Sequence, residues 1–485
     1  MASSAYQYAI SVALFASIGT FLFGFDTGIA TTTISHQSWK DYMDHPGTGL
    51  TGAVVSVFIA GEAVGSITQF LLGDKLGRLG FLQFLCVTVT IGAAIQTGAV
   101  NMGMFLAGRA IAGIGIGGLV SSVPLYLVEI SAPSYRGFIG SISGCGMTFG
   151  IMVSNWVGYA CAHAPYGPLQ WRLPLGLQIP WGILLFIGLA TFMPDSPRML
   201  IRAGKTDAAR AEFVKIRKDL QSHEVADEFR LMQGQIEYEM AREIKSWKQV
   251  FTLYRRRALV AISIQVMTSL TGVNVIQYYQ TTIYTNLGMG SMTILALAGV
   301  YGTVSFLCNC VTTFWLIDQW GRRKMLLTGM AGIVLVEIYT AEMQRGFAIG
   351  TNRVGQGFTI LGIYLFAVFY YSFLGSTVWI YPPEIIPLEL RNKVVAIATA
   401  SHFIVNIAIT EAGPTAFKNI QENYYYVFVG CTIIFTVIGY FFYPETRRKT
   451  LEEIAGAFGD EVVTEVEDKP SGGLDGGQVE VIEEV

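Results

Sequence analysis

The sequence carries little charge for its length. Asp, Glu, Lys and Arg make up 14% of the 485 residues and 52% are hydrophobic, whereas about a quarter of the residues of a soluble chain are charged. The charged residues are gathered between long stretches that have almost none. This distribution argues against a water-soluble protein and favours a chain surrounded by lipid.

Cysteine and histidine are also scarce. The six cysteines and five histidines are spread along the chain without the spacing of a ligand cluster, so we expect no disulfide framework, no metal site and no cofactor. Neither a Ser/His/Asp nor a Cys/His arrangement is evident, which argues against an enzyme. The first apolar stretch lacks a small-residue cleavage site, so we interpret it as a membrane span and not as a signal peptide.

Long apolar stretches, by contrast, are abundant. A helix needs roughly 20 mainly apolar residues to cross the hydrocarbon core of a bilayer, where it satisfies its own backbone hydrogen bonds. The stretches that fit are residues 8–29, 51–72, 80–99, 103–127, 138–160, 171–193, 258–286, 292–317, 324–344, 357–381, 393–414 and 423–443. The sequence therefore predicts an all-α membrane protein of twelve transmembrane helices.

Lys and Arg are shared unequally between the two sets of short loops. One set contains most of them, including Arg78, Arg136 and Arg322, and the other set contains few. Because Lys-rich and Arg-rich short loops stay in the cytoplasm, we expect both termini to be cytoplasmic. We expect a multi-pass protein of the plasma membrane.

Two segments interrupt or follow the spans. Residues 198–257 are amphipathic and carry both signs of charge, which is typical of short helices on a membrane surface and not of a nucleic-acid-binding segment. Residues 456–485 are rich in glycine and acidic residues, and we expect them to be disordered. The predicted parts are an N-terminal six-helix half (1–197), an intracellular linker (198–257), a C-terminal six-helix half (258–455) and the tail.

Three charged motifs occur twice, in the same order and at a nearly constant offset. The pairs are Asp74–Arg78 with Asp318–Arg322, Glu129–Arg136 with Glu384–Arg391, and Pro194–Arg198 with Pro444–Arg447. Such internal symmetry indicates two pseudo-symmetric halves of common descent that enclose one site near the membrane midplane.

The charges of these motifs are candidate latches. An Arg beside a carboxylate at a helix end can hold two helices together and release them when that face opens; static salt bridges are the alternative. The predicted cytoplasmic gating charges are Asp74, Arg78, Glu129, Arg136, Asp195, Arg198, Asp318, Arg322, Arg323, Glu384, Arg391 and Glu445.

Nine short motifs stand in register along residues 8–454. They are Gly24–Gly28, Gly73–Arg78, Gly108–Arg109, Glu129–Gly137, Pro194–Arg198, Gly272–Asn274 with Tyr278–Tyr279, Gly321–Arg323, Trp379–Glu384 and Pro444–Arg447. In these motifs the chain resembles the sugar porter family of the major facilitator superfamily, and its Tyr-Pro-Pro-Glu run resembles fungal members. The resemblance implies transport of a monosaccharide or a related polyhydroxylated solute by alternating access in a monomer, with proton symport favoured.

Asp26 and Arg109 are ionisable residues inside spans one and four. Because an intramembrane charge is costly, such a residue is a functional candidate, and the natural partner of a buried Asp is a buried Arg. Both lie toward the outer ends of their spans, so they could meet, and protonation of Asp26 could then couple to substrate binding. Proton symporters of the family carry Asp at the Asp26 position, but some fungal facilitators keep it, so symport, facilitated diffusion and a structural pair all stay open.

The resemblance also implies a substrate site. Asn274 and Trp379 match a sugar-contacting Asn and a stacking Trp of the family, and an indole face suits the C–H side of a pyranose. The predicted substrate-binding residues are Phe23, Thr268, Ser269, Asn274, Trp379, His402 and Asn406, and the predicted outer gate is Tyr278 with Tyr279.

Several amides of the family pattern are missing. The span-five glutamine is replaced by Gly144, the paired span-seven glutamines by Thr268 and Ser269, the span-eight asparagine by Phe306 and a span-eleven amide by His402. These replacements weaken the expectation that glucose is the substrate. A carrier of sugar acids such as galacturonate or quinate is one alternative, and a non-transporting sugar sensor on the same scaffold is another.

Overall fold

The computed structural model describes residues 4–132, 135–217, 222–241, 254–347 and 352–447, with five single residues between 449 and 458. Within this part it contains helices and no strands, and its helices form 12 segments that are long and apolar enough to cross a membrane. The predicted all-α architecture with twelve spans is therefore confirmed. The predicted disordered tail lies almost entirely outside the described residues.

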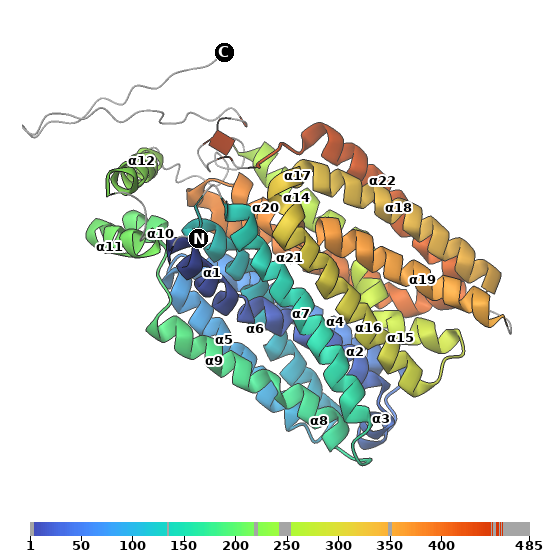
Figure 1. The fold of residues 1–485 in the computed structure, drawn as a ribbon. Coiled ribbons are helices and arrows are strands. Elements are labelled where there is room, and N and C mark those ends of the chain that lie inside the picture. Colours follow the sequence, from blue (N-terminus) through green and yellow to red (C-terminus); the bar gives the residue numbers. More distant parts are fainter. Residues whose placement is uncertain are drawn as a thin grey trace, which may run out of the picture.

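The first six spans form one half of an elongated bundle (Figure 1). Its helices are α1 (Ser4–Ala16), α2 (Ile18–Ser35), α3 (Gln37–Tyr42), α4 (Thr48–Leu72), α5 (Gly77–Thr97), α6 (Met102–Ile130), α7 (Arg136–Ala162), α8 (Leu169–Gly176) and α9 (Gln178–Thr191). Helices α1 and α2 form span one, and α8 and α9 form span six. Most helix ends lie a few residues beyond the predicted limits.

The last six spans form the second half. Its helices are α14 (Arg255–Leu270), α15 (Val273–Asn286), α16 (Ser291–Val311), a π turn (Thr312–Leu316), α17 (Ile317–Trp320), α18 (Arg322–Phe347), α19 (Arg353–Phe369), a second π turn (Tyr370–Leu374), α20 (Thr377–Ile385), α21 (Leu388–Asn419), a 3₁₀ turn (Gln421–Asn423) and α22 (Tyr424–Phe442). The two halves pack together mainly through α7 with α16 and through α4 with α21.

Three helices lie between the halves in sequence and outside the bundle in space (Figure 1). They are α10 (Pro197–Arg202), α11 (Thr206–Ile216) and α12 (Ser222–Ala241). Residues 218–221 and 242–253 of the predicted linker lie outside the described residues. The helices cover the end of the bundle where α1 begins and α22 ends, which we call the termini face.

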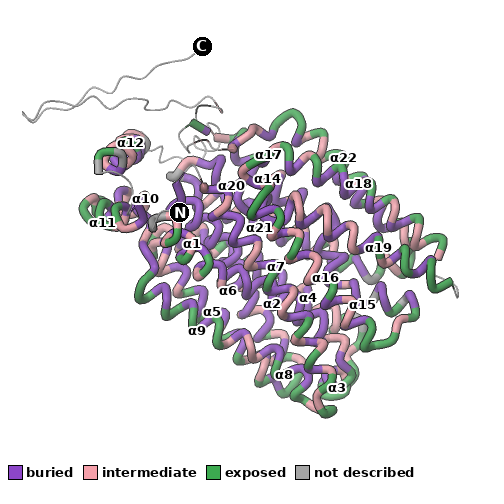
Figure 2. Tube along the Cα trace, viewed as in Figure 1, coloured by how far each residue is buried: buried purple, intermediate pink, exposed green. Residues whose placement is uncertain are grey.

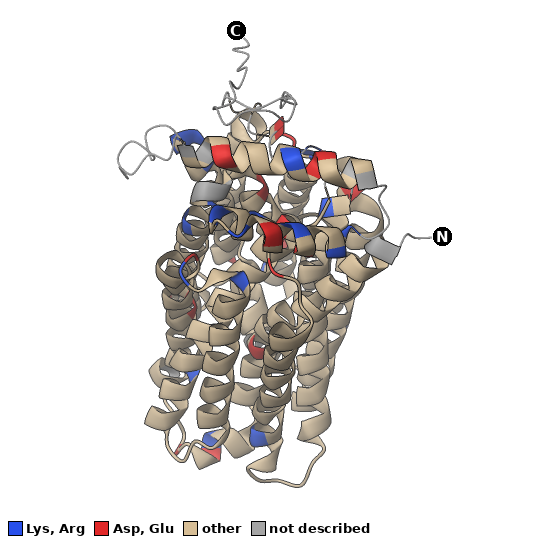
Figure 3. Cartoon of the chain, turned by 90° about the vertical axis from the view of Figure 1, so that its left-hand side faces the viewer, with Lys and Arg blue, Asp and Glu red and all other residues tan. Residues whose placement is uncertain are grey.

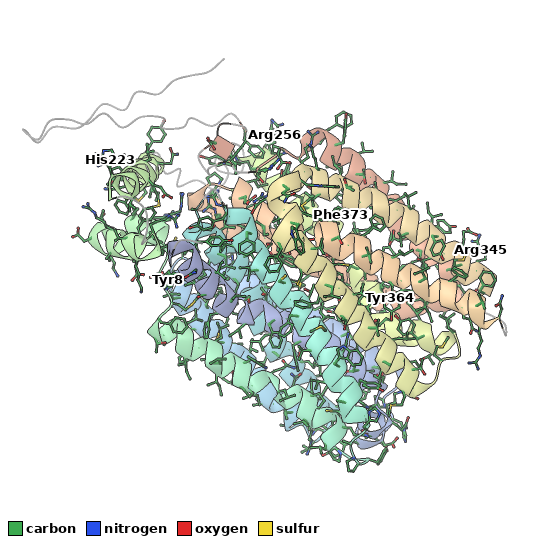
Figure 4. The ribbon with its side chains drawn as sticks, viewed as in Figure 1. Tyr8, His223, Arg256, Arg345, Tyr364 and Phe373 are labelled. Carbon is green, nitrogen blue, oxygen red and sulfur yellow. The ribbon has the colours of Figure 1, made fainter. Side chains whose placement is uncertain are left out.

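Charge and burial follow the pattern of a membrane-embedded bundle. Charged residues gather at the termini face and on the linker helices, whereas the flanks carry few (Figure 3). Buried residues fill the interior and exposed ones lie on the outside (Figure 2), where large apolar side chains such as Leu335 (69% exposed) face outward. Figure 4 labels Tyr8 near the termini face and Arg345 at the opposite face.

Span seven departs from the prediction. The stretch 258–286 is two helices, because Gly272 adopts a left-handed conformation (φ +74°) between α14 and α15. Glycine populates this region readily, while a side chain would be strained there. Interrupted spans are the elements from which transporter sites are usually built, and this break places Asn274 in the first turn of a new helix.

Glycines set the approach of α4 to α6. A Cβ atom added at Gly117 would lie 2.2 Å from the backbone oxygen of Glu62, and one at Gly65 would lie 2.0 Å from the oxygen of Ile114. Small residues allow this backbone contact between membrane helices. The contact fixes the position of Glu62 in the core of the first half.

Candidate functional site

Asp26 and Arg109 meet, as the sequence predicted. Their side chains form a salt bridge between α2 and α6, with exposures of 0% and 1%. Gln178 donates a hydrogen bond from Nε2 to the second Asp26 oxygen at 2.8 Å, and Arg109 Nε donates to the carbonyl oxygen of Val54 at 3.2 Å. The Arg109 guanidinium also lies 4.0 Å from the ring centroid of Phe58. The pair is thus held by residues of two further helices of the first half, α4 and α9.

Two polar residues of this cluster were missed by the sequence analysis. Gln178 begins α9 and binds Asp26. Glu62 lies in the middle of α4 with 0% exposure and interacts electrostatically with Asp26 and Arg109. The rule that marks an intramembrane acid as functional could have found Glu62, whereas nothing in the sequence distinguishes Gln178.

Four of the predicted substrate residues come together near the middle of the bundle. The Trp379 ring lies 6.3 Å from that of Phe23, across the two halves, and 5.5 Å from the imidazole of His402. Ser269 Oγ lies 2.8 Å from His402 Nδ1. Spans one, seven, ten and eleven therefore converge on one partly polar aromatic cluster.

Helix α15, which packs on α2 and α21, carries two amides on one face. Asn274, Gln277 and Tyr278 keep 4–8% exposure, whereas Val275 and Gln280 are completely buried. Within the described residues, Nδ2 of Asn274 and Nε2 of Gln277 have no hydrogen-bond partner. Gln277 was missed by the sequence analysis, although an i, i+3 spacing from Asn274 places both on one helix face.

Other predicted substrate and gate residues make contacts within their own helix or with a neighbouring helix. Thr268 donates to the Ile264 carbonyl oxygen of its own helix at 2.8 Å, and Asn406 accepts a hydrogen bond from Thr410 at 2.9 Å. Tyr279 donates to the Thr410 carbonyl oxygen at 2.9 Å, which ties α15 to α21. The buried Tyr278 lies beside Glu62 and Thr27 of the opposite half.

The structure explains why position 144 is a glycine and not a glutamine. A Cβ atom there would lie 2.1 Å from Oγ of Ser376 and 2.9 Å from its Cα, so Ser376, just before α20, leaves no room for a glutamine on α7. Ser376 instead donates to Asn309 Oδ1 at 2.9 Å. Phe306 packs its ring on Phe149, with the centroids 5.3 Å apart.

The predicted gating charges of the first half lie at the termini face around the buried pair of Arg78 and Glu129. Arg78 donates to the two Glu129 oxygens at 3.1 and 2.8 Å and to Asp74 at 3.4 Å. Ser196 Oγ donates to Glu129 at 2.8 Å. Asp195 accepts from the Ser196 backbone N–H at 2.8 Å, and burial raises the pKa of its carboxyl. The half-buried Arg198 follows in α10.

The second half repeats this arrangement. Arg322 donates to Glu384 at 2.9 Å and to Asp318 at 3.4 Å, and Thr446 takes the place of Ser196 by donating to Glu384 at 2.7 Å. Glu445 accepts hydrogen bonds from the backbone N–H groups of Arg322 and Arg323 at the start of α18. The internal repeat in the sequence thus corresponds to a repeat in space.

Contacts between the halves close the termini face. Asp318 accepts from the Phe138 backbone N–H at 3.1 Å, and Asn392 Nδ2 donates to the Gln69 carbonyl oxygen at 2.9 Å. Arg391 lies 3.9 Å from Glu129. Arg136 donates to the Lys449 carbonyl oxygen at 3.3 Å. These links cross between the halves where opening would have to begin.

Comparisons with known proteins place the chain in a known group. Residues 12–458 match the family described as "Sugar (and other) transporter". The MFS-type transporter criB of Aspergillus cristatus is 33% identical over 455 residues, 93% of each chain. The low-affinity glucose transporter HXT3 of Saccharomyces cerevisiae is 31% identical over 474 residues, 92% of this chain and 81% of the relative.

Solved structures share the fold. The proton:xylose symporter XylE bound to 6-bromo-6-deoxy-D-glucose superposes with a TM-score of 0.84 at 20% identity, with 93% of this chain and 99% of that chain covered. The inward-open conformation of XylE from E. coli gives a TM-score of 0.70 at 19% identity, with 93% and 100% covered.

Proposed function

Because the chain belongs to the family of sugar (and other) transporters, we propose that it carries a monosaccharide or a closely related polyhydroxylated solute across the membrane in symport with protons. The observation that carries the proton coupling is the Asp26–Arg109 salt bridge, buried inside the spans. A carboxylate that is paired when ionised loses its partner when it is protonated. Protonation of Asp26 therefore releases α2 from α6.

The transport cycle proceeds by alternating access. The contacts between the halves at the termini face, such as Asn392 with Gln69, must open while those at the opposite face close. If substrate binding loosens the Asp26–Arg109 pair, it favours protonation of Asp26, and protonation favours substrate binding by the same factor. We place both termini in the cytoplasm, the protein in the plasma membrane and the transport unit in a monomer.

The substrate cluster supports a polyhydroxylated solute. Trp379 and Phe23 offer aromatic faces, and Asn274 and Gln277 offer unpaired amide nitrogens, which suit a ring with one apolar side and several hydroxyls. The space for a glutamine beside Gly144 is taken by Ser376. We therefore expect D-glucose to bind less tightly than the true substrate, and a competition panel of hexoses, pentoses and sugar acids identifies that substrate.

Asp26→Asn tests the coupling, because the amide mimics a permanently protonated carboxyl. In proteoliposomes, wild-type protein should accumulate radiolabelled substrate when an inward pH gradient is imposed. D26N should lose accumulation while counterflow exchange stays measurable. Asp41→Asn is the matched control, since Asp41 lies on α3 with its side chain 39% exposed, and it should behave as wild type.

Other outcomes separate the alternatives. Wild-type uptake that ignores the pH gradient and never exceeds equilibration would identify a uniporter, with Asp26 as a structural tie. Substrate binding without counterflow would identify a sensor. Competition by sugar acids alone would identify a sugar-acid carrier.

A further inference from the structure

Glu62 is a buried acid that coupling through Asp26 and Arg109 does not use. It lies in the middle of α4 with 0% exposure, and within the described residues neither carboxylate oxygen has a hydrogen-bond partner. An ionised carboxylate left unpaired in an apolar interior is strongly disfavoured. In this conformation the Glu62 side chain is therefore neutral, with a proton on one of its oxygens.

Arg109 is the cation beside this acid. Its guanidinium stacks on Phe58, and Phe58 precedes Glu62 by one turn on the same face of α4. Glu62 interacts electrostatically with both Arg109 and Asp26. Nη1 of Arg109 binds Asp26 and Nε binds the Val54 carbonyl oxygen, but Nη2 has no partner in the described structure. One arm of the guanidinium is thus free while Glu62 is unpaired.

Among the residues that the structure describes, the other helices around Glu62 bring no second cation. Helix α2 contributes Asp26, and α15 contributes Tyr278, whose hydroxyl interacts electrostatically with Glu62. Helix α21 packs along α4, and its titratable residue near the level of Glu62 is His402. The His402 imidazole is engaged by Ser269 of α14. Among these groups, two acids face one guanidinium.

We propose that Glu62 is a second proton-binding residue of the coupling site and shares Arg109 with Asp26. In the conformation described, Asp26 is ionised on Arg109 and Glu62 holds the proton. When one proton passes from Glu62 to Asp26, Arg109 exchanges Asp26 for Glu62, and the three side chains keep a net charge of zero. Glu62 lies one turn nearer the termini face than Phe58, so the proton leaves toward that face from Glu62.

The proposal rests on the proposed symport, and Glu62→Gln tests it. In proteoliposomes, E62Q should no longer concentrate substrate under an inward pH gradient, and its uptake should lose its dependence on pH, while counterflow stays measurable. Glu337→Gln is the matched control. Glu337 is also buried, with both oxygens unpaired in the described structure, but it lies on α18 of the other half, and E337Q should keep accumulation and pH profile.

The outcomes distinguish this proposal from the proposed function. Wild-type uptake that ignores the gradient overturns both. Coupled uptake by wild type together with unchanged accumulation and pH profile in E62Q overturns only the role of Glu62. Loss of coupling in E62Q with retention in E337Q supports it.

A spectroscopic measurement covers the case in which E62Q does not fold. In an E337Q background, infrared spectra should contain the C=O stretch of a protonated carboxyl from Glu62. Asp26→Asn frees Arg109, so Glu62 should ionise and the band should vanish at the same pH. A band of unchanged intensity and pH dependence in D26N would show that the two acids do not share Arg109.

Discussion

At the scale of single residues, Trp379 is the largest side chain of the predicted substrate cluster. It contacts Phe23 of the first half and His402 of the second, so its removal should take away a stacking surface. We expect Trp379→Ala to weaken binding of the substrate by roughly 1–3 kcal/mol, the size of a central contact. Binding to purified protein measures the change. Trp315→Ala is the control, because Trp315 is 59% exposed; equal affinity in both variants would make Trp379 a packing residue.

The residues of the site were predictable to different degrees. Asp26 and Arg109 could be predicted as a pair, because a charge inside a span demands a partner whatever the details of packing. Gln178 could not, because an amide near a helix start has no such cost and its contact with Asp26 depends on how α9 lies against α2. Gly144 was recognised as a replacement, but its cause, the approach of Ser376, exists only in three dimensions.

At the scale of helices, the number of spans could be predicted from hydropathy, but the positions at which a span is interrupted could not. The apolar stretch 258–286 gives one continuous signal, although the chain breaks at Gly272. The π turn at Thr312–Leu316 contains neither glycine nor proline, so nothing local marks it. The position of such a π turn is not marked by a local residue type. The spacing of apolar residues in the sequence indicates only a regular helix.

The glycine contact between α4 and α6 gives a prediction at this scale. Gly117→Ala forces a methyl group onto the Glu62 backbone, 2.2 Å from its oxygen and 2.4 Å from its Cα. We expect a loss of stability of roughly 1–3 kcal/mol, as for other overpacked cores, seen as a lower unfolding temperature of the purified protein.

Gly430→Ala provides the comparison for that change. Gly430 lies within α22 and has no atom within 4 Å of an added Cβ, so alanine should be neutral or slightly stabilising there. If both variants melt at the same temperature as wild type, α4 can move away from α6 at no cost and the contact is not rigid.

At the scale of the whole molecule, the halves are joined along α7 and α16. Cys145 and Cys310 face each other across this interface with their sulfur atoms 3.8 Å apart, and both are free thiols. A disulfide needs a separation of about 2.05 Å, which requires a small approach. We expect mild oxidation with copper phenanthroline to join them and stop transport, and reduction to restore it, as measured by counterflow.

Cys145→Ser separates this effect from oxidation elsewhere. The variant should transport as wild type and resist the oxidant, because the remaining cysteines lack this partner. In the wild-type protein, transport that continues after oxidation has joined Cys145 to Cys310 would mean that the halves move without any change along α7 and α16.

The shared guanidinium also has an electrical consequence. With one proton, Asp26, Glu62 and Arg109 sum to zero, so the loaded carrier reorients without moving charge. Without the proton the same three groups sum to −1, so the empty carrier takes a negative charge with it on its return. A charge that crosses the whole membrane field gains about 2.3 kcal/mol per 100 mV. With the proposed cytoplasmic placement of the termini, a negative cell interior drives that return. The membrane potential then controls the rate at which the empty carrier returns. The pH gradient controls the rate at which the loaded carrier reorients.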